Sequence, residues 1–124
     1  MNISIQCQQI RIKILIAFEN EFRAYRQTLA AAIGTLRPDA EVITAEAHEI
    51  RGVVERSGPE IVICSLSKDD TLTRVRAWIE LSLDPIQPTK VRIDGKYSEI
   101  INPTLDALLA VIEEVEQFVR TCKH

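Results

Sequence analysis

The chain has few glycines, few cysteines and no concentrated charge of one sign, and each shortage removes a class of function. Only four glycines occur among 124 residues, and none belongs to a Gly-x-Gly-x-x-Gly run or a phosphate-binding loop, so we expect no nucleotide cradle. The three cysteines lie far apart, which argues against a disulfide framework and a zinc site. Fifteen basic and eighteen acidic residues are scattered along the chain, so no basic face for nucleic acid is expected.

Long hydrophobic runs are missing too. No window approaches the roughly 20 apolar residues that a membrane helix needs. The first residues carry neither the basic start nor the apolar stretch of a signal peptide. With the cysteine usage, these absences lead us to expect a cytoplasmic protein that does not contact a membrane. The apolar content of 46% predicts a single globular domain over residues 1–124, in which residues 1–10 form a loose arm or an added edge strand.

The most informative segment that is present runs from Pro59 to Leu66. It follows Ser57-Gly58, which is typical of a helix end, and its residues from Ile61 to Cys64 are all apolar and mostly β-branched. The stretch is too short for a helix, and a strand of this composition is buried on both faces. We therefore expect it in the middle of a parallel sheet.

Strands and helices alternate before this segment. The hydrophobic pattern predicts strands over residues 11–18 and 41–45, a helix over 20–36 capped by Asn20, and a weaker helix over 47–56. Such alternation is typical of a parallel sheet with right-handed crossovers. The first half thus indicates an α/β fold.

The second half departs from this rhythm. Residues 67–74 have room for a turn or two of helix, and residues 75–83 alternate like a strand with one buried face. Asp94-Gly95 predicts a hairpin that places Lys90 opposite Glu99 and Arg92 opposite Tyr97. A last helix is expected over 103–121, with Asn102 as its cap and Glu116 facing solvent. We predict a mainly parallel central sheet of five or six strands with flanking helices and a reduced second half.

Three segments have the arrangement of a known family. A strand over residues 13–18 leads to Glu19, a second leads to Ser65, and Asn102-Pro103 opens the last helix. In these segments the chain resembles a response-regulator receiver domain of the flavodoxin-like type. The resemblance places the acidic position and the phosphoacceptor position at the ends of the two strands, and the cationic position at the start of the last helix.

The functional residues of receivers do not carry over. Ser65 occupies the position of the phosphorylated aspartate, Phe18 replaces one of the two acids that hold Mg²⁺, and Asn102 replaces a lysine, while Glu19 is retained. Aspartyl phosphorylation needs a carboxylate nucleophile, a metal held by acids and a nearby cation. The resemblance therefore implies a pseudo-receiver that signals through contacts, with no catalytic residue, metal or cofactor.

Polar residues follow the predicted strands at the edge where such sheets bind ligands. These candidates for a partner or ligand patch are Glu19, Asn20, Ser65, Ser67 and Lys68, with Asp84 as a further neighbour. The simpler interpretation is that they are solvated loop residues. Trp78, the single tryptophan, falls on the polar side of its strand and is either half covered by a loop or an interface anchor.

The helix count suggests an incomplete cover for the sheet. In the receiver arrangement the first and last helices share one face, which leaves only the short second helix for the other. A bare apolar patch marks a contact surface, and a symmetric homodimer is the commonest way to cover such a patch. We therefore predict a non-catalytic protein-interaction or signalling domain that acts through homodimer or partner contacts. The alternative is a small-ligand-binding or enzymatic domain that uses the carboxyl ends of the strands.

Overall fold

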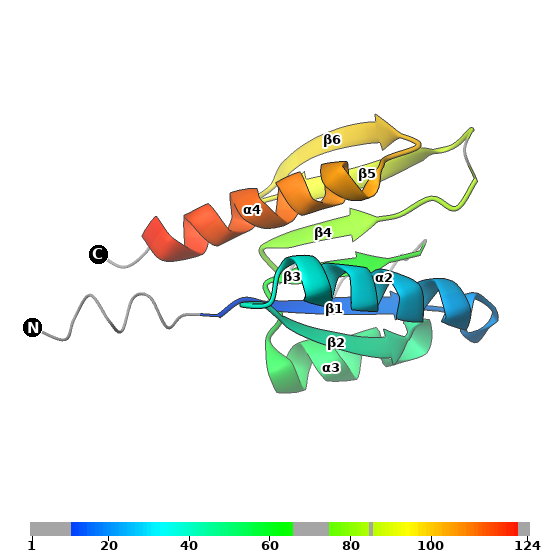
Figure 1. The fold of residues 1–124 in the computed structure, drawn as a ribbon, viewed down its shortest axis with the longest axis horizontal. Helices are drawn as coiled ribbons and strands as arrows, with labels where there is room; N and C mark the ends of the chain where they lie inside the picture. The colour runs from blue at the N-terminus through cyan, green and yellow to red at the C-terminus, as the bar shows by residue number, and fades with distance from the viewer. Residues whose placement is uncertain (1–10, 66–74, 85, 122–124) are drawn as a thin grey trace, which may run out of the picture.

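The computed structural model describes residues 11–65, 75–84 and 86–121, which form one sheet with three α-helices (Figure 1). The elements are β1 (Lys13–Phe18), η1 (Asn20–Phe22), α2 (Arg23–Leu36), β2 (Glu41–Glu46), η2 (Ala47–Glu49), α3 (Ile50–Ser57), β3 (Ile61–Cys64), β4 (Ala77–Glu80), β5 (Pro88–Ile93), β6 (Lys96–Ile101) and α4 (Leu105–Thr121). The arm or strand expected over residues 1–10 and the short helix expected over 67–74 lie outside the described residues.

The sheet is mixed, so the prediction of a mainly parallel, receiver-like or flavodoxin-like sheet is wrong. Its strand order is β2-β1-β3-β4-β5-β6. The pairs β1–β2, β1–β3 and β3–β4 are parallel, whereas β4–β5 and β5–β6 are antiparallel. The physical reason lies in the connections. Neither the link between β4 and β5 nor the Asp94-Gly95 turn is long enough for the crossover that parallel neighbours require.

The core has two layers, one on each face of the sheet. On one face α2 and α4 pack against the strands, through Leu29 and Ile33 of α2 and Ile112 of α4 among others. On the other face α3 is the only helix in the described part of the chain, and it packs against β1 and β3. All four residues of β3 are fully buried, which confirms the strand predicted from the apolar stretch. Figure 1 shows α2 and α4 in front of the sheet and α3 at its β2 end.

The sheet face that carries α3 is covered unequally. Among the described residues, no helix lies on this face over β4, β5 and β6. Two large side chains of β6 point to this face. Tyr97 is 63% exposed and Ile101 is 69% exposed. The expectation that the first and last helices share one face is therefore confirmed, and the outer part of the opposite face is open in the part of the chain that the structure describes.

The β5–β6 hairpin is confirmed in its register. Lys90 lies opposite Glu99, and Arg92 lies opposite Tyr97. Asp94 and Gly95 have φ values of 48° and 85°, so both central residues are left-handed, as a type I′ turn requires. This turn twists in the same sense as the strands and fixes which side chains share a face.

The residues predicted to cap the N-terminal ends of the helices do not do so, whereas the predicted C-terminal cap is present. No side-chain hydrogen bond caps η1 or α2, so the cap expected from Asn20 is wrong. At the last helix, the hydroxyl of Thr104 accepts a hydrogen bond from the backbone N–H of Ala107 at 3.2 Å, while Asn102 has a φ of 51° outside the helix. Gly58, with a φ of 59°, closes α3 in the left-handed conformation as expected.

Two charged side chains lie inside the helical layer. Glu116 of α4 is only 6% exposed and forms an ion pair with Arg37 at the end of α2, so the expectation that it faces solvent is wrong. Arg26 of α2 is 8% exposed, and its Nη1 donates to the carbonyl oxygens of Phe18 and Ala45 at 2.9 and 3.0 Å. The helical layer therefore contains a cation that satisfies one carbonyl near the end of β1 and one near the end of β2. Within the described residues, no helix is long and apolar enough to cross a bilayer.

Candidate functional site at the carboxyl ends of the strands

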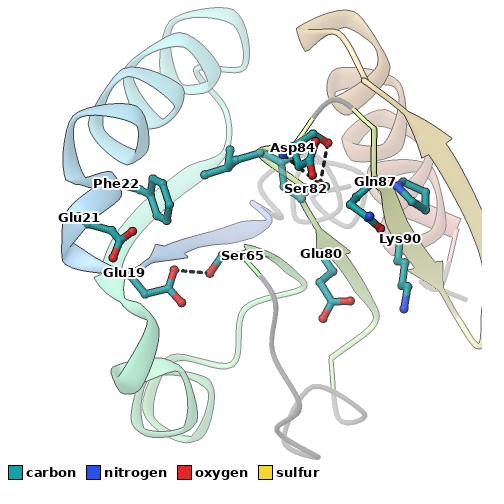
Figure 2. A pocket seen from close by; sticks show the side chains of 12 residues that line it. Glu19, Glu21, Phe22, Ser65, Glu80, Ser82, Asp84, Gln87 and Lys90 are labelled. Carbon is teal, nitrogen blue, oxygen red and sulfur yellow. Dashed lines mark hydrogen bonds between the residues drawn. The ribbon is translucent and has the colours of Figure 1, made fainter.

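A cavity of about 600 Å³ opens where the parallel strands β1, β3 and β4 end. One wall is made by η1 and the ends of β1 and β3, and the other by the end of β4 and the start of β5 (Figure 2). The lining residues are Glu19, Glu21, Phe22, Ser65, Glu80, Leu81, Ser82, Leu83, Asp84, Gln87, Pro88 and Lys90. The edge of the sheet is the place where open α/β folds bind ligands.

Glu19 and Ser65 are joined across the first wall. The Ser65 hydroxyl donates a hydrogen bond to Oε1 of Glu19 at 2.7 Å. Ser65 directly follows β3 and is only 8% exposed, whereas Glu19 directly follows β1 and is exposed. The backbone N–H of Phe22 donates to the Glu19 carbonyl at 2.9 Å, which starts the η1 turn and keeps Glu19 at the end of its strand. The hydroxyl thus orients a solvent-facing carboxylate.

The second wall is shaped by a hydrogen-bonded loop. The N–H of Ser82 donates to the hydroxyl of Thr89 at 2.9 Å, and Thr89 is fully buried. The carboxylate of Asp84 accepts from the N–H of Ile86 at 3.0 Å. Glu80 lies opposite Lys90 in the β4–β5 register. These contacts place two carboxylates and one ammonium group beside the cavity.

The electrostatic balance at the cavity is negative. Four carboxylates, those of Glu19, Glu21, Glu80 and Asp84, line it against a single ammonium group. This negative charge affects the pKa of the neighbouring Cys64. Burial, followed by the negative charges of Glu80 and Glu19, raises the pKa of its thiol to about 12. Cys64 therefore remains a protonated thiol and is not a nucleophile at neutral pH.

The chemistry available to Ser65 is binding and orientation. A serine nucleophile needs an adjacent base strong enough to take its proton. Its partner Glu19 is a solvent-exposed carboxylate, and a carboxylate is a weak base for a serine hydroxyl. His48, the one histidine in the part of the chain that the structure describes, is exposed on η2 beside Glu46. Among the described residues, no three His, Cys, Asp or Glu side chains converge as metal ligands.

The structure separates the residues predicted to form one patch. Glu19 and Ser65 meet at the cavity, whereas Asn20 is exposed and does not line it. Trp78 lies on the sheet face that carries α3, where the Arg92 guanidinium sits 3.9 Å from the centre of its ring. Ser67 and Lys68 lie outside the described residues.

Sequence reasoning missed most of the second wall. In the sequence Glu80 is a polar residue of an alternating strand, Lys90 is a hairpin residue opposite Glu99, and Phe22 belongs to the apolar stripe of a helix. Only Asp84 was noted, from its place after a predicted strand. The available signal was the short link between β4 and β5, whose residues line the cavity together with those that follow β1 and β3.

Comparisons with known proteins give no family assignment. No protein-family model matches the chain, and no curated protein is similar to it. The resemblance to receiver domains therefore stays a prediction that depends on the quoted segments.

Proposed function

We propose that this protein is a non-catalytic interaction domain that forms a homodimer through β6. The observation that carries the proposal is that β6 is an edge strand whose side chains are almost all exposed. They include Tyr97 and Ile101, two large groups on one face of the strand. A strand of this kind is a ready template for pairing with another chain.

The turn geometry determines which main-chain groups of β6 are available. In a two-residue hairpin the residues that flank the turn form a hydrogen-bonded pair, so Lys96 bonds to Ile93 and every second residue after it bonds to β5. The N–H and C=O groups of Tyr97 and Glu99 then point away from β5. Among the described residues, no strand lies beyond β6 to accept them.

A second copy of the chain fits this edge. Antiparallel pairing centred on Ser98 places Tyr97 opposite the partner's Glu99, which keeps the two Glu99 carboxylates apart. In the same register Tyr97 is the diagonal neighbour of the partner's Ile101, so their exposed apolar surfaces meet. The arrangement is a two-fold symmetric contact, the commonest form of oligomer.

The non-catalytic part of the proposal has a separate basis. Ser65 stands where the receiver resemblance expects the phosphorylated aspartate, and its hydroxyl faces a weak base. The free buried thiol of Cys64 suits a reducing compartment, so we place the protein in the cytoplasm. Signalling would then depend on association rather than on phosphoryl transfer.

The oligomeric state of a matched pair of variants tests the dimer. Light scattering coupled to size exclusion should give a dimer for the wild type and for Thr44→Lys, which adds a charge to the exposed opposite edge strand β2. Tyr97→Lys should give a monomer, because it adds a charge at the proposed contact. A monomeric wild type at about 100 μM, well above micromolar affinities, would remove the proposal.

Cross-linking tests the register independently. Opposite residues in a non-hydrogen-bonded antiparallel pair lie about 4.5 Å apart at Cα, which permits a disulfide. Oxidised Ser98→Cys should therefore form a covalent dimer that the wild type, with its own cysteines, does not form. A dimer that scattering detects but Ser98→Cys does not trap would exclude this register.

A further inference from the structure

We infer that the cavity at the carboxyl ends of β1, β3 and β4 binds an organic cation, namely a protonated amine carried on an apolar chain. The inference is independent of the dimer, because the cavity is lined by η1, the ends of β3 and β4 and the start of β5, and β6 contributes no residue to it. Its volume of about 600 Å³ lies within the range of small-molecule sites.

The cavity has an apolar surface as well as a charged one. Phe22, Leu81, Leu83 and Pro88 line it, and Figure 2 shows the Phe22 ring directed into the space between the two walls. Phe22 and Leu81 also pack in the main core, which holds this part of the lining in place. An alkyl chain would cover these groups, and the face of the Phe22 ring attracts a cation.

The carboxylates are divided between the two walls. Glu19 and Glu21 come from the η1 side, and Glu80 and Asp84 come from the β4 side. Lys90 opposes Glu80 across the β4–β5 ladder, so the excess negative charge rests mainly on the other three. A ligand with two ammonium groups separated by methylenes matches two walls that each carry both carboxylates and apolar side chains.

The same arrangement favours an amine over a metal ion. A divalent cation requires several oxygen ligands that converge on one point. Among the described residues, the acidic side chains do not converge in this way. An alkylammonium ion needs only carboxylate acceptors near its ends and an apolar wall along its length, and the cavity supplies both.

Calorimetric titration of the full chain with spermidine tests the inference. We expect saturable binding that weakens as salt is added, since the attraction is between charges. The neutral probe 1,6-hexanediol should give no saturable heat, and Mg²⁺ should compete no better than its ionic strength predicts. Absence of saturation by spermidine up to about 10 mM, or equal binding of the neutral diol, would overturn the inference.

Paired variants locate the site. Glu21→Gln combined with Asp84→Asn removes two charges but keeps acceptor oxygens, and it should weaken spermidine binding about tenfold, as loss of charged hydrogen-bond partners does. The control Glu113→Gln combined with Glu114→Gln removes two exposed charges from α4 and should change nothing. Equal weakening by both pairs would show that spermidine only coats the surface and would overturn the inference.

The aromatic wall and the source of the cation are tested in the same way. Phe22→Leu keeps an apolar wall without the ring face and should weaken binding about threefold. Amidated trilysine offers the same ammonium groups on a peptide. Weaker binding of trilysine than of spermidine supports a free amine, whereas binding more than tenfold tighter would identify a protein side chain as the source and exclude the small molecule. Tyr97→Lys should bind spermidine like the wild type, so failure of the dimer leaves this result intact.

Discussion

The two halves of the sheet differ in how many of their faces are covered by helices. The parallel half, β2-β1-β3, lies between α2 on one face and α3 on the other, and β3 is fully buried. The antiparallel half, β4-β5-β6, rests on α4 through one face, and its described residues have no helix on the other. Connection length therefore decides coverage, because crossovers bring their own helices to a sheet, whereas hairpins leave a face and an edge to other contacts.

The open face of the antiparallel half is ordered by rows of side chains. The strand registers align Trp78, Arg92 and Tyr97 in one row across three strands, with an arginine between two aromatic residues. The next row alternates in charge, with Lys90 between Glu80 and Glu99. Cross-strand pairs of this kind stabilise a sheet by fractions of a kcal/mol each, without the exclusion of water that the parallel half achieves.

A pair of isoleucine truncations should give the largest contrast between the halves. Ile63→Ala removes a fully buried side chain from β3 and should lower the free energy of unfolding by about 3 kcal/mol, because a cavity remains. Ile101→Ala, in the exposed β6, should change it by less than about 0.5 kcal/mol. Urea denaturation measures both, with the protein kept below its association concentration. Similar losses would mean that β6 is as buried as β3.

The buried end of β3 should also give a pH dependence. Because the pKa of Cys64 is raised from 9.0 to about 12, the unfolded chain loses this proton at lower pH than the folded chain does. The contribution of the Cys64 thiol to the free energy of unfolding is therefore complete below pH 9 and is lost as the pH rises toward 12. We expect the free energy of unfolding to fall with pH in this window.

Matched variants show how much of this fall in the free energy of unfolding with pH is due to Cys64. Burial also raises the pKa of Tyr25, which acts in the same direction over part of the window. Cys64→Ala should remove more of the alkaline slope than Tyr25→Phe does, because Cys64 is fully buried and Tyr25 is partly exposed. Denaturant titrations at a series of pH values measure the slopes. An unchanged slope in Cys64→Ala would place the thiol in contact with water.

The parts of this fold that sequence reasoning predicted are those fixed by local patterns. An unbroken apolar stretch gave a strand buried on both faces, and Asp94-Gly95 gave the hairpin and its register. The mainly parallel sheet was wrongly predicted because alternation in residues 75–83 identifies a strand but not the direction of its neighbours. Arg26 and Glu116 were missed because a helical pattern assigns charges to solvent, whereas carbonyl groups and an opposite charge hold them inside.

The site was predictable to the same local extent. Glu19 and Ser65 each follow a strand, so their meeting at the sheet edge could be expected from parallel strands. The second wall depends on where the end of β4 and the start of β5 lie relative to that edge, which no local pattern encodes. Charged residues such as Glu80 gain their place at the cavity only from this tertiary arrangement.

The Arg37–Glu116 ion pair joins the two halves and should show an intermediate effect. It connects the end of α2 to α4, and Glu116 is nearly buried. A double-mutant cycle with Arg37→Met and Glu116→Gln should give a coupling energy of about 1–2 kcal/mol, reduced from that of a fully buried pair by the partial exposure of Arg37. The exposed pair Arg76–Asp94, at 3.4 Å, should couple by no more than about 0.5 kcal/mol. Equal couplings would contradict the difference in burial.

The smallest expected effect tests whether the open face is as ordered as its rows suggest. Arg92→Met keeps the apolar stem of Arg92 but removes the guanidinium 3.9 Å from the Trp78 ring, and it should cost about 0.5–1 kcal/mol. Arg92→Lys keeps the charge without the planar group and should recover part of that loss. Because Trp78 is the single tryptophan, tryptophan emission reports on the surroundings of this ring. An emission spectrum identical in the wild type and both variants would mean that no guanidinium lies over the ring, and that the outer half depends on α4 rather than on its cross-strand rows.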